Sequence, residues 1–86
     1  MDERLQRAPS KEEVDEESRR VRRLRIAVHL SLSLIAQGNL PYQEAQEIAA
    51  ATRRVALSLF PGKENVYDLI FRPKFQQLIR EVYRLN

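Results

Sequence analysis

The feature that most constrains this chain is an apolar stripe with helical spacing that begins inside a strongly charged segment. The stripe consists of Val21, Leu24, Val28, Leu32 and Ile35. At about 100° per residue, these side chains fall on one face of a helix. Upstream, Ser10 and Glu13 have the spacing of a capping box, and downstream Gly38 suits the left-handed position that ends a helix. We therefore predict one long helix over about residues 11–37.

The same region also alternates apolar and polar residues, which is the pattern of a strand. The alternating positions are Leu24, Ile26, Val28, Leu30, Leu32 and Leu34. A strand of this length would be unusual, and the sequence has no second β-like run to pair with it. Because a helix needs no such partner, we favour the helix.

A second apolar stripe lies on the opposite side of the predicted helix and consists of Ile26, Leu30 and Leu34. A surface helix of a small protein needs only one buried face. The second apolar face implies either a central helix wrapped by the others or a contact between subunits. Because few other helices are available to cover it, we expect these three side chains to join two copies in a homodimer, or to bind a protein partner.

Proline and glycine divide the rest of the chain into three further helical segments. Pro41 suits the first position of a second helix, which Phe60-Pro61-Gly62 ends. Its predicted inward residues are Ala45, Ile48, Ala49, Thr52, Val55, Ala56 and Leu59. A short helix follows over about residues 65–71, with Asn65 or a neighbour as its cap, and Pro73 starts the last one. The residues of the last helix that are predicted to face the core are Phe75, Leu78, Ile79, Val82 and Leu85.

The length of 86 residues leaves room for one hydrophobic core. We expect residues 1–10 to form a flexible arm and residues 11–86 to form a single helical domain. The short loop from Gly38 to Pro41 favours an antiparallel pairing of the first two helices. The predicted fold class is all-α, a helical hairpin followed by a short helix and a C-terminal helix in a small bundle.

Charge is distributed unevenly along the chain. Residues 1–18 hold seven acidic and three basic side chains, whereas residues 19–86 hold five acidic and twelve basic ones. The basic part opens with a cluster of five arginines: Arg19, Arg20, Arg22, Arg23 and Arg25. Such a cluster can neutralise several phosphates, so binding of nucleic acid is an alternative function. The simpler explanation is that these arginines pair with the acidic run that precedes them on the helix.

Side chains that carry catalysis or bind metals are scarce. The sequence contains no cysteine and one histidine, His29, which excludes thiol chemistry and clusters of cysteine or histidine ligands. We expect His29 to be a partly buried structural residue, because no carboxylate lies three or four positions away. Glu44 and Glu47 share a helix face, but no Glu-x-x-His motif accompanies them. The sequence predicts a protein that is not an enzyme and that has no metal, cofactor or small-molecule substrate.

The apolar stretch over residues 26–36 is too short to span a bilayer of about 30 Å, and Ser31 and Ser33 make it a poor secretion signal. We therefore expect a cytoplasmic protein. The sequence as a whole predicts an interaction or regulatory module that self-associates through its first helix.

Overall fold

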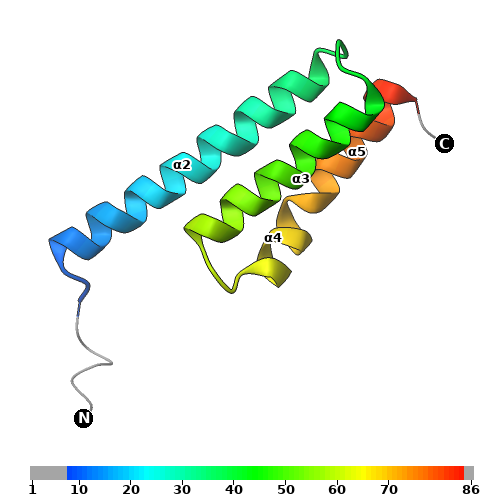
Figure 1. Ribbon diagram of the computed structural model, residues 1–86. Coiled ribbons are helices and arrows are strands. Elements are labelled where there is room, and N and C mark those ends of the chain that lie inside the picture. The colour runs from blue at the N-terminus through cyan, green and yellow to red at the C-terminus, as the bar shows by residue number, and fades with distance from the viewer. Residues whose placement is uncertain (1–7, 85–86) are drawn as a thin grey trace.

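A computed structural model describes residues 8–84 of the chain and contains four helices in this part (Figure 1). They are α2 (Lys11–Ala36), α3 (Tyr42–Leu59), α4 (Glu64–Ile70) and α5 (Arg72–Tyr83). The described residues contain no strand, so the all-α prediction is confirmed and the helix is the correct choice over residues 24–34. The predicted arm over residues 1–10 falls largely outside the described part.

The long helix α2 begins and ends where the sequence signals predict. The backbone N–H of Glu13 donates a hydrogen bond to Ser10 Oγ at 3.1 Å, which satisfies one of the free amides of the first turn. At the other end, the helix stops at Ala36, one residue earlier than expected. Gly38 follows with φ of 72°, a left-handed conformation that glycine adopts without steric cost.

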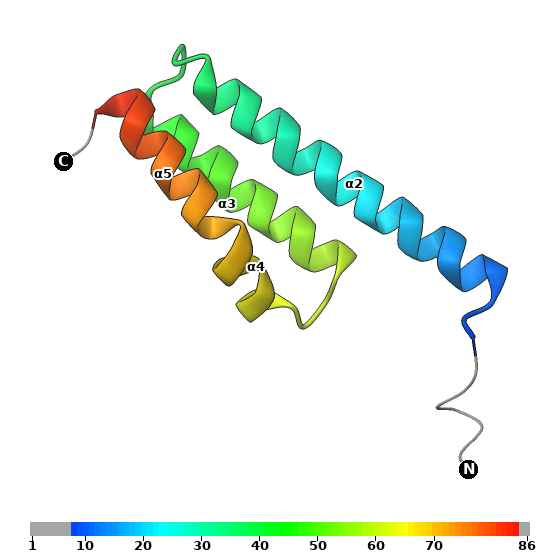
Figure 2. The ribbon, with the colours of Figure 1, turned by 180° about the vertical axis from the view of Figure 1, so that it is seen from behind.

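The core lies where α5 packs against the antiparallel pair formed by α2 and α3, and Figure 2 shows this arrangement from behind. One cluster of buried side chains joins the three helices: Val28, Ile35, Ala45, Phe75 and Ile79. Ala45 and Ala56 are almost fully buried, as expected for small residues at a close approach of helices. The predicted inward faces of α2 and α5 are confirmed within the described residues, which do not include Leu85.

A polar contact between Thr52 and Ser31 fixes the position of α3 along the axis of α2. Thr52 is buried, and its hydroxyl lies 2.6 Å from the hydroxyl of Ser31 and 2.8 Å from the carbonyl oxygen of Ile48. Because a hydroxyl has one proton, Ser31 donates to Thr52 when Thr52 donates to Ile48. This contact satisfies the polar atom of Thr52 within the helix interface.

Three details of the predicted segments are corrected by the structure. Pro41 lies at the N-cap of α3 with ψ of 149°, and not at the first helical position, because its carbonyl accepts the first α3 hydrogen bond from Ala45. The cap of α4 is Lys63, two residues before Asn65, so the helix begins slightly earlier than predicted. Val55 is 44% exposed, although the spacing placed it inward.

The N-terminal part of α2 extends past the end of α3, so the molecule is elongated, at 56 × 21 × 16 Å (Figure 1). α2 has 26 residues and α3 has 18, which correspond to lengths of about 39 and 27 Å. Every side chain from Lys11 to Arg19 is exposed. These first turns of α2 therefore lie outside the three-helix core.

Candidate functional site

The second apolar stripe of α2 remains exposed in the folded chain. The exposed fractions are 52% for Ile26, 57% for Leu30 and 46% for Leu34. We call these three residues the outer ridge. Because Val28 and Ile35 of the same helix are buried, the opposite face already supplies the contacts to the core. The outer ridge is thus not part of the intramolecular core.

Val55 of α3 extends this apolar surface. It follows the buried Thr52 by one turn, on the flank of α3 opposite to Arg53. Since Thr52 contacts Ser31 and the two helices are antiparallel, Val55 lies at the level of residues 26–30 of α2. The exposed apolar surface therefore spans both helices of the hairpin.

The arginine cluster is divided between one tethered residue and four exposed ones. Arg20 binds Glu16 at 3.2 Å and Glu17 at 3.0 Å, and its guanidinium lies 5.9 Å from the ring centre of Phe60. The expected pairing with the acidic run is confirmed for Arg20. The other members are exposed and form no ion pair within the described residues: Arg19, Arg22, Arg23 and Arg25.

His29 is exposed, which corrects the expectation that it is partly buried. It borders a shallow depression between α2 and α5 together with Lys74 and Glu81. Among residues 8–84, no three side chains of the metal-ligating types gather in one place. None of the helices described is both long enough and apolar enough to cross a membrane.

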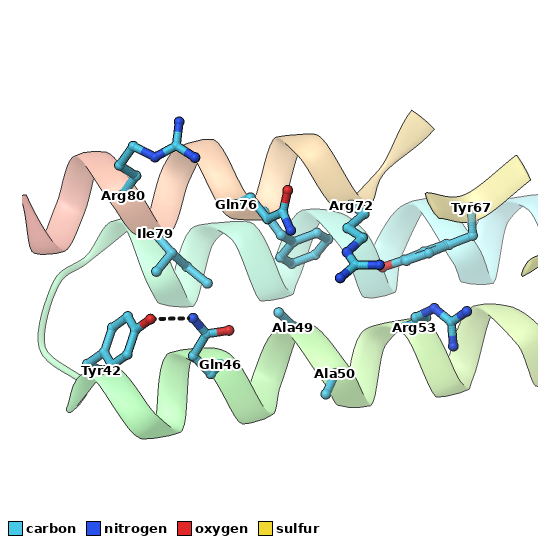
Figure 3. A pocket seen from close by; sticks show the side chains of 11 residues that line it. Tyr42, Gln46, Ala49, Ala50, Arg53, Tyr67, Arg72, Gln76, Ile79 and Arg80 are labelled. Atoms are coloured by element: carbon cyan, nitrogen blue, oxygen red, sulfur yellow. Dashed lines mark hydrogen bonds between the residues drawn. The ribbon is translucent and has the colours of Figure 1, made fainter. Parts of the chain in front are cut away.

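A groove that the sequence did not reveal lies between α3 and α5, closed at one end by α4 (Figure 3). Its volume is about 590 Å³, and no residue of α2 lines it. We call it the α3–α5 groove. Its walls combine aromatic, aliphatic, amide and arginine side chains, and no aspartate or glutamate is among the lining residues.

Arg53 is held at the α4 end of this groove by a two-point ion pair with Asp68. Arg53 Nε donates to Oδ1 at 2.8 Å and Nη2 donates to Oδ2 at 3.1 Å. These hydrogen bonds lower the pKa of the Asp68 carboxyl, and the carboxylate in turn raises the pKa of Arg53. The pair joins α3 to α4, which otherwise has few anchors because it has only seven residues.

This ion pair is expected to make stability depend on pH in the acid range. Because the pKa of Asp68 is below its ordinary 3.8 in the folded chain, its contribution is complete above that pH and is lost as the pH falls through the folded value. Asp68→Asn should lower the melting temperature more at about pH 7 than at about pH 2. Circular dichroism melts of both proteins measure this difference. Glu47→Gln, an exposed change on α3, is the control, and an Asp68→Asn effect of equal size at both pH values would contradict the expectation.

Tyr67 is the most unusual residue of the groove. Only 6% of its surface is exposed, and its hydroxyl has no hydrogen-bond partner in the described structure. In Figure 3 the hydroxyl is directed toward the groove and overlaps the guanidinium of Arg72 in this view, and both residues line the groove. Burial, opposed by the charge of Arg53, raises the pKa of the phenol, so it remains protonated and can donate at neutral pH. A buried polar group without a partner costs free energy, which makes this position exceptional.

Sequence spacing could not have identified the groove, because its residues come from three helices. The one available signal is the proline-interrupted segment from Phe71 to Phe75, which supplies Arg72 and Phe75 to the groove and whose simplest interpretation is a turn with core aromatics. Comparison with known proteins gives no family: no family model, curated protein or solved structure matches this chain. Inferences about function therefore rest on the geometry described above.

Proposed function

We propose that this chain is a non-enzymatic interaction or regulatory module of the cytoplasm that binds a second copy of itself through the outer ridge. The observation that carries the proposal is the exposure of Ile26, Leu30 and Leu34, each about half accessible, on a helix whose opposite face is already buried. Exposed apolar side chains that form a contiguous surface are typical of interaction sites.

The spacing of the ridge fits a crossed pair of helices. Its residues are four apart and therefore form a single i±4 row. Rows of this type interdigitate when two helices cross at about 50°. In an antiparallel crossing about a twofold axis at Leu30, Ile26 of one copy would meet Leu34 of the other, and Val55 would border the contact on both sides.

Charge also favours a crossed pair over a parallel one. Arg19 and Arg23 lie on the same face of α2 as the ridge, nearer the N-terminus. In a parallel dimer each would lie beside its own counterpart, and like charges at close range oppose association. In the crossed dimer the N-terminal halves of α2 diverge, so these arginines are kept apart.

The contact is small. The ridge and Val55 expose only about half of four side chains, which is less than the roughly 800 Å² per partner of a standard interface. We therefore expect weak association, with a dissociation constant in the micromolar range or above.

Light scattering over protein concentrations from about ten to several hundred micromolar tests the proposal. The average mass should rise from 10.1 kDa toward twice that value. Leu30→Glu should weaken the dimer more than about tenfold, because it brings two carboxylates into an apolar contact. A mass that stays at 10.1 kDa for the natural sequence, or that Leu30→Glu leaves unchanged, would overturn the proposal.

The matched control is Leu69→Glu on α4. Leu69 is the most exposed large apolar residue among those described, at 79%, and lies outside the outer ridge. The same substitution there should leave the dimer intact. If Leu69→Glu abolishes association and Leu30→Glu does not, the contact is made by α4 instead. Unchanged circular dichroism spectra show that both variants remain folded.

The four exposed arginines support a second candidate, which is binding of duplex nucleic acid. Arg19 lies in the turns of α2 that extend past the core, and Arg22, Arg23 and Arg25 follow it within the next two turns. This candidate requires a gel shift with duplex DNA at about 50 mM salt that weakens steeply as salt increases. The double variant Arg22→Ala/Arg23→Ala should reduce that shift, and its absence in the natural protein would exclude the candidate.

A further inference from the structure

The α3–α5 groove has the charge expected of a site for an anion. Three arginines line it, Arg53, Arg72 and Arg80, and no acidic side chain does. Asp68, which does not line the groove, pairs with Arg53 and also lies close enough to Arg72 for the charges to interact. Arg72 and Arg80 are exposed and form no ion pair within the described residues. The guanidinium fork binds carboxylate or phosphate oxygens through two hydrogen bonds.

Tyr67 supplies a second and independent observation. Its side chain is more than nine-tenths buried, and its hydroxyl has no partner in the described structure although it points into the groove. The protonated phenol can donate but finds no acceptor. The hydroxyl itself is buried, so an anionic oxygen reaches it only when the exposed side chain of Arg72 turns aside; between the two it would accept from both, and would remove the cost of the unsatisfied buried group.

The remaining walls indicate what the anion is attached to. Ala49, Phe75 and Ile79 form an apolar strip along the groove. Beyond it, Gln46 Nε2 donates to the hydroxyl of Tyr42 at 2.7 Å, so this end is closed by a polar pair. A volume of about 590 Å³ lies within the range of about 300–1,000 Å³ that small-molecule sites occupy. An inorganic ion would leave most of this space empty.

We propose that the α3–α5 groove binds a small organic anion, whose carboxylate or phosphate group accepts hydrogen bonds from Tyr67 and Arg72 and whose apolar body lies along Ala49, Phe75 and Ile79. The site contains no residue of the outer ridge, so it is independent of the self-association proposed above. It also goes beyond the sequence, which suggested no small-molecule ligand.

Titration of the isotope-labelled full chain, followed by amide NMR shifts, tests this inference with three probes: phenyl phosphate, benzoate and inorganic phosphate. Phenyl phosphate or benzoate should give saturable shifts in α3, α4 and α5 with a dissociation constant of about 1 mM or below. The tighter of the two identifies the head group. Inorganic phosphate should bind at least about tenfold more weakly, because it lacks the apolar body.

Two substitutions separate the site from nonspecific attraction to a basic protein. Tyr67→Phe removes only the hydroxyl and should weaken binding of the preferred probe by about tenfold or more. Arg72→Gln should have a similar effect, whereas the control Arg22→Gln on α2 should have none. The melting temperature of Tyr67→Phe without ligand should equal or exceed that of the natural protein, since the hydroxyl makes no hydrogen bond to lose.

Several results would overturn the inference. They are the lack of saturable shifts up to about 10 mM of either organic probe, equal binding by Tyr67→Phe, and equal weakening by Arg22→Gln. Equal affinity for inorganic phosphate would show that the apolar strip plays no part in binding. The mass measurements on Leu30→Glu are unaffected by any of these outcomes, so the two proposals fail separately.

Discussion

Replacement of Ile35 by alanine is expected to lower the free energy of unfolding by about 2–5 kcal/mol. Ile35 has no exposed surface and belongs to the cluster that joins α2, α3 and α5. Its truncation removes apolar contacts and leaves a cavity that three packed helices cannot easily fill. For a chain of 86 residues the total stability is about 4–13 kcal/mol, so this one change removes a large part of it.

Urea unfolding followed by circular dichroism measures this loss, at protein concentrations low enough to keep the chain monomeric. The matched control is Ile70→Ala on α4, because Ile70 is 47% exposed. Both changes gain the same small amount of helix propensity, so the difference between them reports burial. A loss for Ile35→Ala no greater than that for Ile70→Ala would mean that the core is not organised around α2 as described.

Ala45→Leu is the second substitution with a large expected effect. Ala45 is fully buried in α3 at the point where α2 and α5 are both close. Three additional carbon atoms have no space there, and overpacking of this kind costs about 1–3 kcal/mol, or more if the helices must separate. The melting temperature should therefore fall by about 5–20 °C for a domain of this size.

The control for this substitution is Ala50→Leu, five residues further along the same helix. Ala50 is exposed, and leucine has nearly the same helix propensity as alanine, so little change is expected. If the two variants have the same melting temperature, the close approach of helices at Ala45 is not a requirement of the fold. A loss confined to Ala45→Leu would confirm that small residues set the spacing of the bundle.

The sequence was sufficient for those features that depend on neighbouring residues in the chain. The cap at Ser10, the stop at Gly38 and the inward faces of α2 and α5 follow from local hydrogen bonding and helical spacing, and all were correct. Val55 was wrongly predicted to point inward. A helical wheel gives the direction of a side chain, but it does not show how much of the helix surface the neighbouring helix covers. With α2 packed over Thr52, the surface is already covered and Val55 remains at its edge.

The groove could not be predicted, because it depends on how helices meet and not on any one helix. Phe75 was predicted to point inward and is buried, and Tyr67, for which no direction was predicted, is buried as well. The difference between them lies in one hydroxyl that finds no acceptor in the space between α3 and α5. Likewise, the contact of Arg20 with Phe60 could not be predicted, because it requires the C-terminal end of α3 to lie beside α2. No local sequence pattern indicates this arrangement.

The unequal lengths of α2 and α3 also have a consequence for how the molecule opens. The turns from Lys11 to Arg19 are held by their backbone hydrogen bonds, by the cap at Ser10 and by the ion pairs of Glu16 and Glu17 with Arg20, and none of their side chains is buried. An isolated helical segment of this length is marginal in water. These turns can therefore fray and re-form without disturbing the rest, whereas the turns around Val28 and Ile35 open only when the whole bundle unfolds. We therefore expect two kinds of amide hydrogen exchange within the single helix α2. The amides of the first turns exchange through local opening, whereas those around Val28 and Ile35 exchange only through global unfolding.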